Sequence, residues 1–221
     1  MRSADGSALI SVGETMLICT ASLIAGVPSW REPSGKGWIT AEYGMLPAST
    51  GERRTRDSTR GRPDGRTIEI QRLIGRSLRA AVDFEALGPR TVYVDCDVVQ
   101  ADGGTRCAAI TGGYVAMQLA LAKLVESGSL ARLPLTTSVA AVSCGLVDGA
   151  PLLDLCYAED SGAQVDMNVV MTGDGGLVEV QATGEKIPFS RASLDQLLGL
   201  AAAGIESLRR DQAEAVGELP G

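Results

Sequence analysis

The chain has 221 residues, a formal net charge of −7 and no histidine. The absence of histidine excludes Ser–His–Asp and Cys–His catalysis, His-ligated zinc and any imidazole base, so chemistry must rest on carboxylates, arginines, backbone amides, a metal or the substrate. The acidic balance excludes a surface that is basic all over, so nucleic-acid binding would need a local basic patch.

The five cysteines are odd in number and form no Cys-x-x-Cys pair. Because they lie in apolar patterns, we expect reduced thiols packed in a core rather than disulfides or a metal site. The sequence has no basic leader followed by an apolar core, and we expect no apolar run that approaches a membrane span. These features predict a cytoplasmic protein that contacts no membrane.

The chain begins with predicted β-strands. Residues 7–12 and 15–22 alternate in polarity around a Gly-Glu pair, which is typical of a β-hairpin. A loop rich in proline, glycine and charge covers residues 26–37, and an alternating strand is predicted over 38–47. A helix with one apolar stripe is predicted to begin at Thr67, which puts Arg66 just before its first turn.

Residues 52–66 form the one basic cluster, with six arginines against three acids. A solvated surface loop explains this composition. A guide for a polyanion explains it equally, because flexible arginine-rich segments contact phosphates without reading bases.

The central stretch, residues 95–124, reads as strand, glycine turn and helix. Gly103-Gly104 ends the strand, and apolar residues recur at helical spacing from Thr105, at or near the N-cap. Backbone N–H groups and the helix dipole at such a point suit an anion, and Arg106 adds a planar fork that suits phosphate. Helix capping alone would also explain Gly-Gly-Thr, and the stretch is neither a Walker loop nor a Gly-x-Gly-x-x-Gly fingerprint.

The C-terminal half is predicted to hold strands over 139–147 and 152–157, joined by an Asp-Gly hairpin turn, and a further strand pair with the return strand at 177–183. A final amphipathic helix is predicted from Ser190. The order of elements predicts an α+β fold with helices packed on mixed sheets, in one domain over 1–221.

Asp160 and Asp166 are predicted at the mouths of neighbouring strands. Two such carboxylates can hold a hard cation such as Mg²⁺ or Mn²⁺ through oxygen ligands. Aspartates are also common turn formers, so the residues alone leave both interpretations open.

Four separated blocks closely resemble ribonuclease PH, a family of bacterial phosphorolytic exoribonucleases. They are Gly-Trp-Ile-Thr-Ala-Glu-Tyr-Gly-Met-Leu-Pro at 37–47, Gly-Arg-Thr at 65–67, Asp-Cys-Asp-Val-Val-Gln-Ala-Asp-Gly-Gly-Thr-Arg at 95–106, and Glu-Asp-Ser-Gly-Ala-Gln-Val-Asp-Met-Asn at 159–168. The resemblance extends from the first hairpin to the last helix. The family's opening leader and first strand have no counterpart, so we expect an unpaired edge on the first sheet. Ala48 and Gly51 stand where the family often has arginine and histidine.

The resemblance implies an α+β fold, assembly as a homo-oligomer, commonly a hexameric ring of dimers, and phosphorolysis of RNA 3′ ends. The expected co-substrate is inorganic phosphate, the expected RNA is precursor tRNA, and the expected products are nucleoside diphosphates. The positions that bind phosphate in the family correspond to Arg66, Gly104, Thr105 and Arg106. The positions that form the catalytic metal site, expected to bind Mg²⁺ or Mn²⁺, correspond to Asp160 and Asp166, with Arg106 the third catalytic residue. Arg53, Arg54 and Arg56 lie in the region that lines the RNA path.

Two other classes stay open. One is a non-catalytic ring subunit that binds RNA, against which the intact phosphate and metal motifs argue. The other is a hydrolytic metal-dependent exonuclease, which would not need an arginine-lined phosphate pocket and would release monophosphates.

Overall fold

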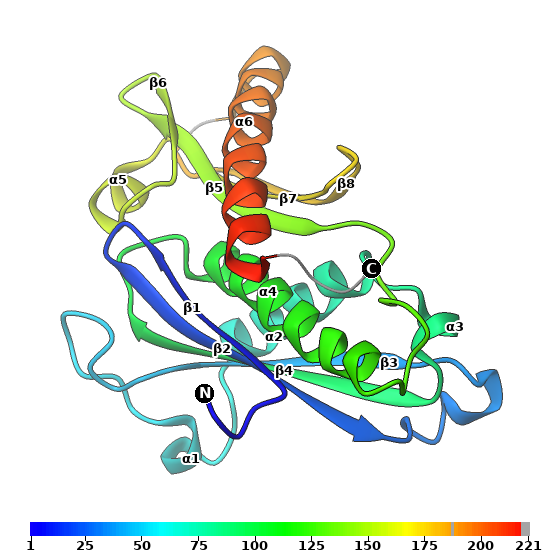
Figure 1. Cartoon of the computed structure of the whole chain (residues 1–221). Helices are drawn as coiled ribbons and strands as arrows, with labels where there is room; N and C mark the ends of the chain where they lie inside the picture. The colour runs from blue at the N-terminus through cyan, green and yellow to red at the C-terminus, as the bar shows by residue number, and fades with distance from the viewer. Residues whose placement is uncertain (187, 218–221) are drawn as a thin grey trace.

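The computed structural model describes residues 1–186 and 188–217, which form two four-stranded sheets with helices packed on them (Figure 1). The first sheet has the order β1-β2-β4-β3, in which β3 and β4 run parallel and the other neighbours antiparallel. Its strands are β1 (Gly6–Val12), β2 (Thr15–Ala25), β3 (Trp38–Met45) and β4 (Arg90–Gln100). The second sheet has the antiparallel order β6-β5-β7-β8. Its strands are β5 (Val139–Val147), β6 (Ala150–Leu153), β7 (Val165–Thr172) and β8 (Leu177–Gly184).

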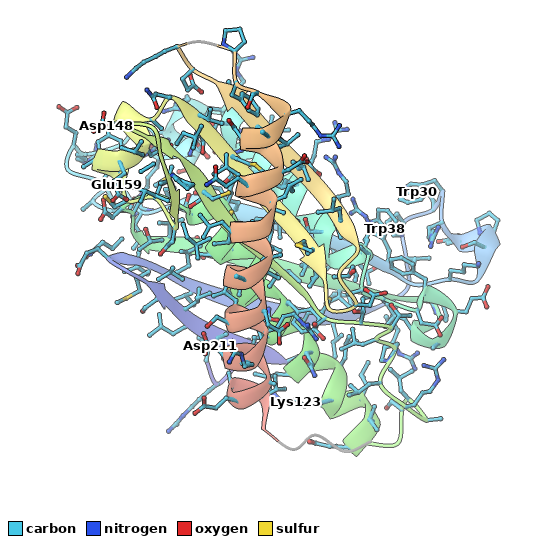
Figure 2. The ribbon with its side chains drawn as sticks, turned by 90° about the horizontal axis from the view of Figure 1, so that it is seen from above. Trp30, Trp38, Lys123, Asp148, Glu159 and Asp211 are labelled. Carbon is cyan, nitrogen blue, oxygen red and sulfur yellow. The ribbon has the colours of Figure 1, made fainter. Side chains whose placement is uncertain are left out.

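The longer helices pack on the faces of the sheets, and α4 lies between the two sheets. α2 and α4 pack on one face of the first sheet, and α4 also contacts β5 of the second sheet. α6 lies across the opposite face of the second sheet, as Figure 2 shows from above. The helices are α1 (Asp57–Arg60), α2 (Gly65–Arg79), α3 (Phe84–Leu87), α4 (Thr105–Glu126), α5 (Tyr157–Gly162) and α6 (Arg191–Val216), with a 3₁₀ turn at Glu32–Ser34. The predicted α+β class is confirmed.

α4 is the central core helix. With 22 residues, it is long and apolar enough to cross a membrane by length and composition alone, so the expectation that no apolar run reaches this length is wrong. The reason for its composition is burial, because 72% of its most apolar stretch is covered by the rest of the chain. A helix that is apolar all round is typical of such a core position. The five cysteines are free thiols, and four of them are buried, as predicted.

Local capping changes the predicted start of α2. α2 begins at Gly65 rather than Thr67, because the Asp64 carboxylate accepts a hydrogen bond of 2.7 Å from the Thr67 N–H and caps the helix. Arg66 therefore lies inside the first turn and not before it.

The expected edge of the first sheet is formed by β1, which is the first strand in the sheet order.

The predicted strand over 152–157 is wrong after Leu153. β6 ends at Leu153, Asp154 takes a left-handed φ of 57°, and α5 begins at Tyr157. The Glu159 carboxylate accepts a hydrogen bond of 3.0 Å from the Cys156 N–H, and this capping box starts the helix. The short-range capping interaction overrides the alternating pattern that favoured a longer strand.

Gln212 of α6 ties the last helix to the core. Its side chain is buried, and its amide N–H groups donate to the carbonyl oxygens of Thr111 in α4 and Val139 in β5, both at 3.0 Å. One amide thus connects α6, α4 and the second sheet.

We expect Gln212→Leu to lower the free energy of unfolding by roughly 1–3 kcal/mol, because two buried carbonyl groups lose their donor. Gln196→Leu on the exposed side of the same helix is the matched control and should change stability by less than about 0.5 kcal/mol. Urea denaturation of both variants measures the difference, and equal midpoints would show that the Gln212 bridge contributes nothing.

Candidate active site

A cavity of about 390 Å³ opens at the start of α4. It gathers side chains from segments far apart in the sequence: the arginine-rich loop, α2, α4, α5 and β7. Seven residues that the sequence analysis proposed for the site line this cavity, namely Arg54, Arg66, Gly104, Thr105, Arg106, Asp160 and Asp166. The predicted phosphate-binding and metal-binding groups therefore share one space.

The glycine turn at the start of α4 is held by hydrogen bonds from β2 and α5. The Thr15 hydroxyl of β2 donates to the Gly103 carbonyl at 2.7 Å and accepts from the Asp102 N–H at 2.8 Å. The Asp102 carboxylate accepts from the Tyr157 N–H of α5 at 3.1 Å. Gly104, the N-cap residue, takes a left-handed φ of 57°. The backbone at the helix start thus has one defined place between β2 and α5.

A buried hydrogen bond fixes the first turn of α4 against the first sheet. The Tyr43 hydroxyl lies 2.9 Å from Thr105 Oγ1. Burial raises the pKa of Tyr43, although the hydrogen bond to Thr105 and the nearby charges of Arg66 and Arg106 partly oppose the change. Tyr43 therefore stays protonated and can serve as donor or acceptor to Thr105.

The arginine-rich loop contributes unequally to the cavity. Arg54 lines it and lies 3.7 Å from the Asp64 carboxylate, while Arg66 reaches it from the first turn of α2. Arg53 and Arg56 are exposed and are not among the lining residues. The structure thus brings one of the three arginines proposed to contact RNA to the cavity and leaves the other two on the surface beside it.

Asp160 and Asp166 reach the cavity from different elements. Asp166 lies in β7, whereas Asp160 lies in α5 and not at a strand mouth, because the capping box converts this segment into a helix. Burial raises the pKa of Asp166, and the negative charge of Asp160 raises it further while Arg106 opposes the change. The two carboxylates are therefore close enough to repel each other.

The donor set at this position suits a hard divalent cation. In the part of the chain that the structure describes, no group of three or more His, Cys, Asp or Glu side chains is arranged to hold a metal. Mg²⁺ typically binds one or two carboxylates and completes its shell with waters and substrate phosphate oxygens, so Asp160 and Asp166 fit this pattern. A cation would also relieve the repulsion that raises the pKa of Asp166.

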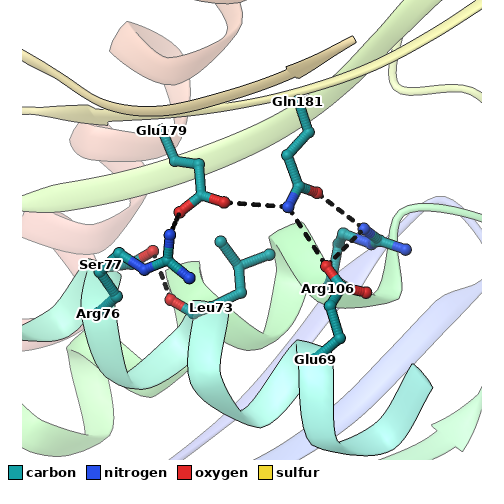
Figure 3. Close-up of polar contacts among 7 residues, drawn as sticks. All are labelled: Glu69, Leu73, Arg76, Ser77, Arg106, Glu179 and Gln181. Carbon is teal, nitrogen blue, oxygen red and sulfur yellow. Dashed lines mark hydrogen bonds and ion pairs between the residues drawn. The ribbon is translucent and has the colours of Figure 1, made fainter. Parts of the chain in front are cut away.

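Gln181, Glu69 and Asn168 of the site were not predicted from the sequence. Gln181 of β8 and Glu69 of α2 contact Arg106, whose side chain is 17% exposed. The Arg106 NH1 atom donates to Gln181 Oε1 at 2.9 Å and lies 3.5 Å from Glu69 Oε1 (Figure 3). Asn168 of β7 is buried and accepts from the Cys107 thiol at 3.2 Å. The sequence signal that could have identified Asn168 is a polar residue in an otherwise apolar strand, since a buried polar group usually has a specific hydrogen-bond partner.

The strand register explains why these polar residues meet. Ser143 of β5 pairs with Asn168 of β7, and Asn168 pairs with Gln181 of β8, so the three form one row across the second sheet. Asp166 lies two residues before Asn168 and points to the same face. The first turn of α4, with Arg106 and Cys107, packs on this row.

Two sheets around a buried helix, with phosphate-binding groups and carboxylates at the start of that helix, define a ribonuclease PH-like α+β fold. A family model described as "3′ exoribonuclease family, domain 1" matches residues 1–123, and "domain 2" of the same family matches residues 137–204. The chain belongs to the 3′ exoribonuclease family. Its single-domain organisation over 1–221 stays a prediction.

Solved structures with similar folds include a rice protein and chains of two exosome structures. Rrp46 of rice (Oryza sativa) has a TM-score of 0.78 and 19% identity, over 98% of this chain and 91% of that chain. A chain of the Archaeoglobus fulgidus exosome with RNA bound to the active site has a TM-score of 0.77 and 23% identity, over 96% and 85%. A chain of an archaeal exosome core has 0.72 and 21%, over 96% and 83%. These identities establish similarity of fold.

We expect Gly103→Ala to disrupt the site by displacing the helix start. A Cβ atom at this position would lie 2.2 Å from the Leu155 carbonyl oxygen, and the φ of 87° also disfavours alanine. Gly128→Ala is the matched control, because Gly128 has a φ of 73° with nothing within 4 Å of the added atom.

Gly128→Ala should lose about 1–2 kcal/mol of stability from backbone strain. Gly103→Ala should lose a further 1–3 kcal/mol, roughly the range for overpacking. Chemical denaturation measures both, and equal losses would mean that contact with Leu155 does not hold the turn.

Proposed function

We propose that this protein is a phosphate-dependent 3′-to-5′ exoribonuclease that removes terminal nucleotides as nucleoside diphosphates. The observation that carries the proposal is the shared cavity, where Arg66, the helix start at Gly104 and Arg106 face the carboxylates of Asp160 and Asp166. Membership in the 3′ exoribonuclease family supports the same direction. Precursor tRNA is the proposed substrate, and processing of tRNA and rRNA the proposed role.

Phosphate is the proposed nucleophile. Backbone N–H groups at the start of α4 and the guanidinium groups of Arg66 and Arg106 suit an oxyanion and would orient it for in-line attack. A phosphate oxygen forms a bond to the last phosphodiester phosphorus while the bond to the 3′ oxygen of the preceding nucleotide breaks. That oxygen can take its proton from hydrogenphosphate itself, so the chain, which has no histidine, needs no imidazole acid.

Asp160 and Asp166 are the proposed ligands of Mg²⁺ or Mn²⁺. When bound, the cation would neutralise charge on the phosphoryl group under attack. The carboxylates themselves would orient the reacting group and keep it beside the arginines. The rest of the RNA would follow the basic loop, where Arg53 and Arg56 are exposed beside the cavity and Arg54 lines it.

The proposed assembly is a homo-oligomer, a hexameric ring of dimers. Support comes from the fold shared with chains of exosome cores, one of them with RNA bound to its active site. The same likeness, and that to rice Rrp46, keeps a non-catalytic RNA-binding ring subunit as the second candidate. The presence of both arginines and both carboxylates in one cavity favours the enzyme.

Incubation with 3′-labelled RNA, with and without inorganic phosphate, tests the proposed reaction. We expect release only with phosphate, and the products should be nucleoside diphosphates.

Arg106→Ala should raise the KM for phosphate roughly 10- to 150-fold, which corresponds to about 1.5–3 kcal/mol for a charged hydrogen bond. Arg191→Ala, at the exposed start of α6, is the control and should leave it unchanged.

Monophosphate release without phosphate would favour a hydrolase and contradict phosphorolysis. Binding of RNA with no release under either condition would favour the non-catalytic subunit.

We expect Asp166→Asn to reduce turnover at least about a hundredfold, as when a group that stabilises transition-state charge is lost.

The same variant should change stability in a pH-dependent way. The folded pKa of Asp166 is raised above the ordinary 3.8, so its ionised form opposes folding, fully at pH values above the folded pKa. In metal-free buffer the variant should therefore melt at or above the wild-type temperature at pH 7. This gain should vanish as the pH falls below about 4.

Asp174→Asn provides a control of opposite sign. A hydrogen bond from the Thr172 hydroxyl lowers the pKa of Asp174, so its ionised form stabilises the fold above the ordinary pKa and this stabilisation is lost on acidification. Asp174→Asn should melt below the wild type at pH 7 and keep its turnover. A destabilised Asp166→Asn variant with normal turnover per folded molecule would give Asp166 a structural rather than a catalytic role.

A further inference from the structure

Arg106 does not stand free at the cavity, because a network of side chains holds its guanidinium (Figure 3). Its NH1 atom donates to Gln181 Oε1 at 2.9 Å and lies at a longer 3.5 Å from Glu69 Oε1. Gln181 is a neutral acceptor in β8, while Glu69 is a charged acceptor in α2 with a side chain that is 45% exposed. The two contacts differ in length, charge and exposure.

The orientation of the Gln181 amide is determined by its other partners. Its Nε2 atom donates to Glu69 Oε1 at 3.2 Å and to Glu179 Oε1 at 2.9 Å, which uses both N–H groups of the amide. Arg76 holds the Glu179 carboxylate in turn, with NH1 2.8 Å from Oε2. A flipped amide would turn its oxygen toward two carboxylates and its N–H groups toward Arg106. Oε1 must therefore face Arg106.

We propose that Gln181 is the positioning residue that aims Arg106 at the incoming phosphate, and that Glu69 is a carboxylate that phosphate displaces from Arg106. This inference rests on the proposed function, since phosphate is the oxyanion concerned. Gln181 acts through Arg106 and does not itself contact the reacting atoms.

Gln181 and Glu69 receive different roles because Gln181 is a neutral acceptor and Glu69 is a charged one. A neutral amide orients the guanidinium without cancelling its charge, so the attraction for an oxyanion is kept. Glu69 competes with that oxyanion, but its contact is long and exposed, and such ion pairs contribute only about 0.2–1 kcal/mol. Both contacts use NH1, so within the described chain Nε and NH2 of Arg106 are not used by Gln181 or Glu69 and remain available to donate to phosphate.

The two residues should have opposite effects on the KM for phosphate. Gln181→Leu should raise it about tenfold, because Arg106 loses the acceptor that orients it. Glu69→Gln should lower it roughly two- to fivefold, because the competing charge is removed while an acceptor for Gln181 remains. The turnover number at saturating phosphate and the Kd for RNA should change less than twofold in both variants.

Gln118→Leu is the matched control for Gln181→Leu. Gln118 lies on α4 twelve residues after Arg106, about 18 Å along the helix axis, and its substitution should leave the KM for phosphate unchanged. Should Gln181→Leu not fold, Gln181→Asn tests the same point, because it keeps the amide and withdraws it from Arg106 by one methylene. Circular dichroism melting of each variant checks the fold.

Calorimetric titration of each variant with inorganic phosphate gives a second measurement that does not depend on turnover. A weaker phosphate affinity in Gln181→Leu with a stronger one in Glu69→Gln supports the inference. Changes of the same sign in both variants, or no change in Gln181→Leu, overturn it and leave the network a structural one. A wild-type protein that binds phosphate but releases no diphosphates would contradict the proposed function and not this assignment.

Discussion

The site depends on one close contact, the approach of Gly103 to the backbone at Leu155. Only glycine leaves room there, since an added Cβ would lie 2.2 Å from the Leu155 carbonyl oxygen. This contact brings the end of β4, in the first sheet, against the segment after β6, in the second. α4 starts where the two meet, so the polar end of the most buried helix opens at the junction rather than at a free surface. The carboxylates of α5 and β7 and the arginines of α2 and α4 line the cavity that opens at this junction.

Electrostatics explains why opposite charges can share the cavity without cancelling each other. The arginines come from α2, α4 and the loop before α2, whereas Asp160 and Asp166 come from α5 and β7. Burial and the Asp160 charge raise the pKa of Asp166 more than Arg106 lowers it, so the arginine does not neutralise this carboxylate. An anion on one side and a cation on the other would complete the charge balance. A phosphate and a divalent cation are the pair that this separation of charge accommodates.

The sequence predicted most of the fold and the residues that carry strong local signals. Gly103-Gly104, Arg106 and the two aspartates stand in distinctive strings, and periodicity located the long helices and most strands. The start of α5 was missed because the capping box of Cys156 and Glu159 is a short-range interaction inside an alternating pattern. Gln181 was missed for a different reason, because it acquires a role only through partners 75 and 112 residues away in the chain.

Strand register connects the topology of the second sheet to the state of Arg106. Ser143, Asn168 and Gln181 face α4 because β5, β7 and β8 pair in one register, whereas Val142, Met167 and their neighbours face α6. A slip of one residue in β8 would send Gln181 to the opposite face and bring an apolar neighbour under the guanidinium. The apolar contacts between the second sheet and α6 oppose such a slip, since it would place polar side chains of β8 against apolar residues. The packing of α6 therefore helps to fix an arginine that α6 does not touch, through the register of the sheet between them.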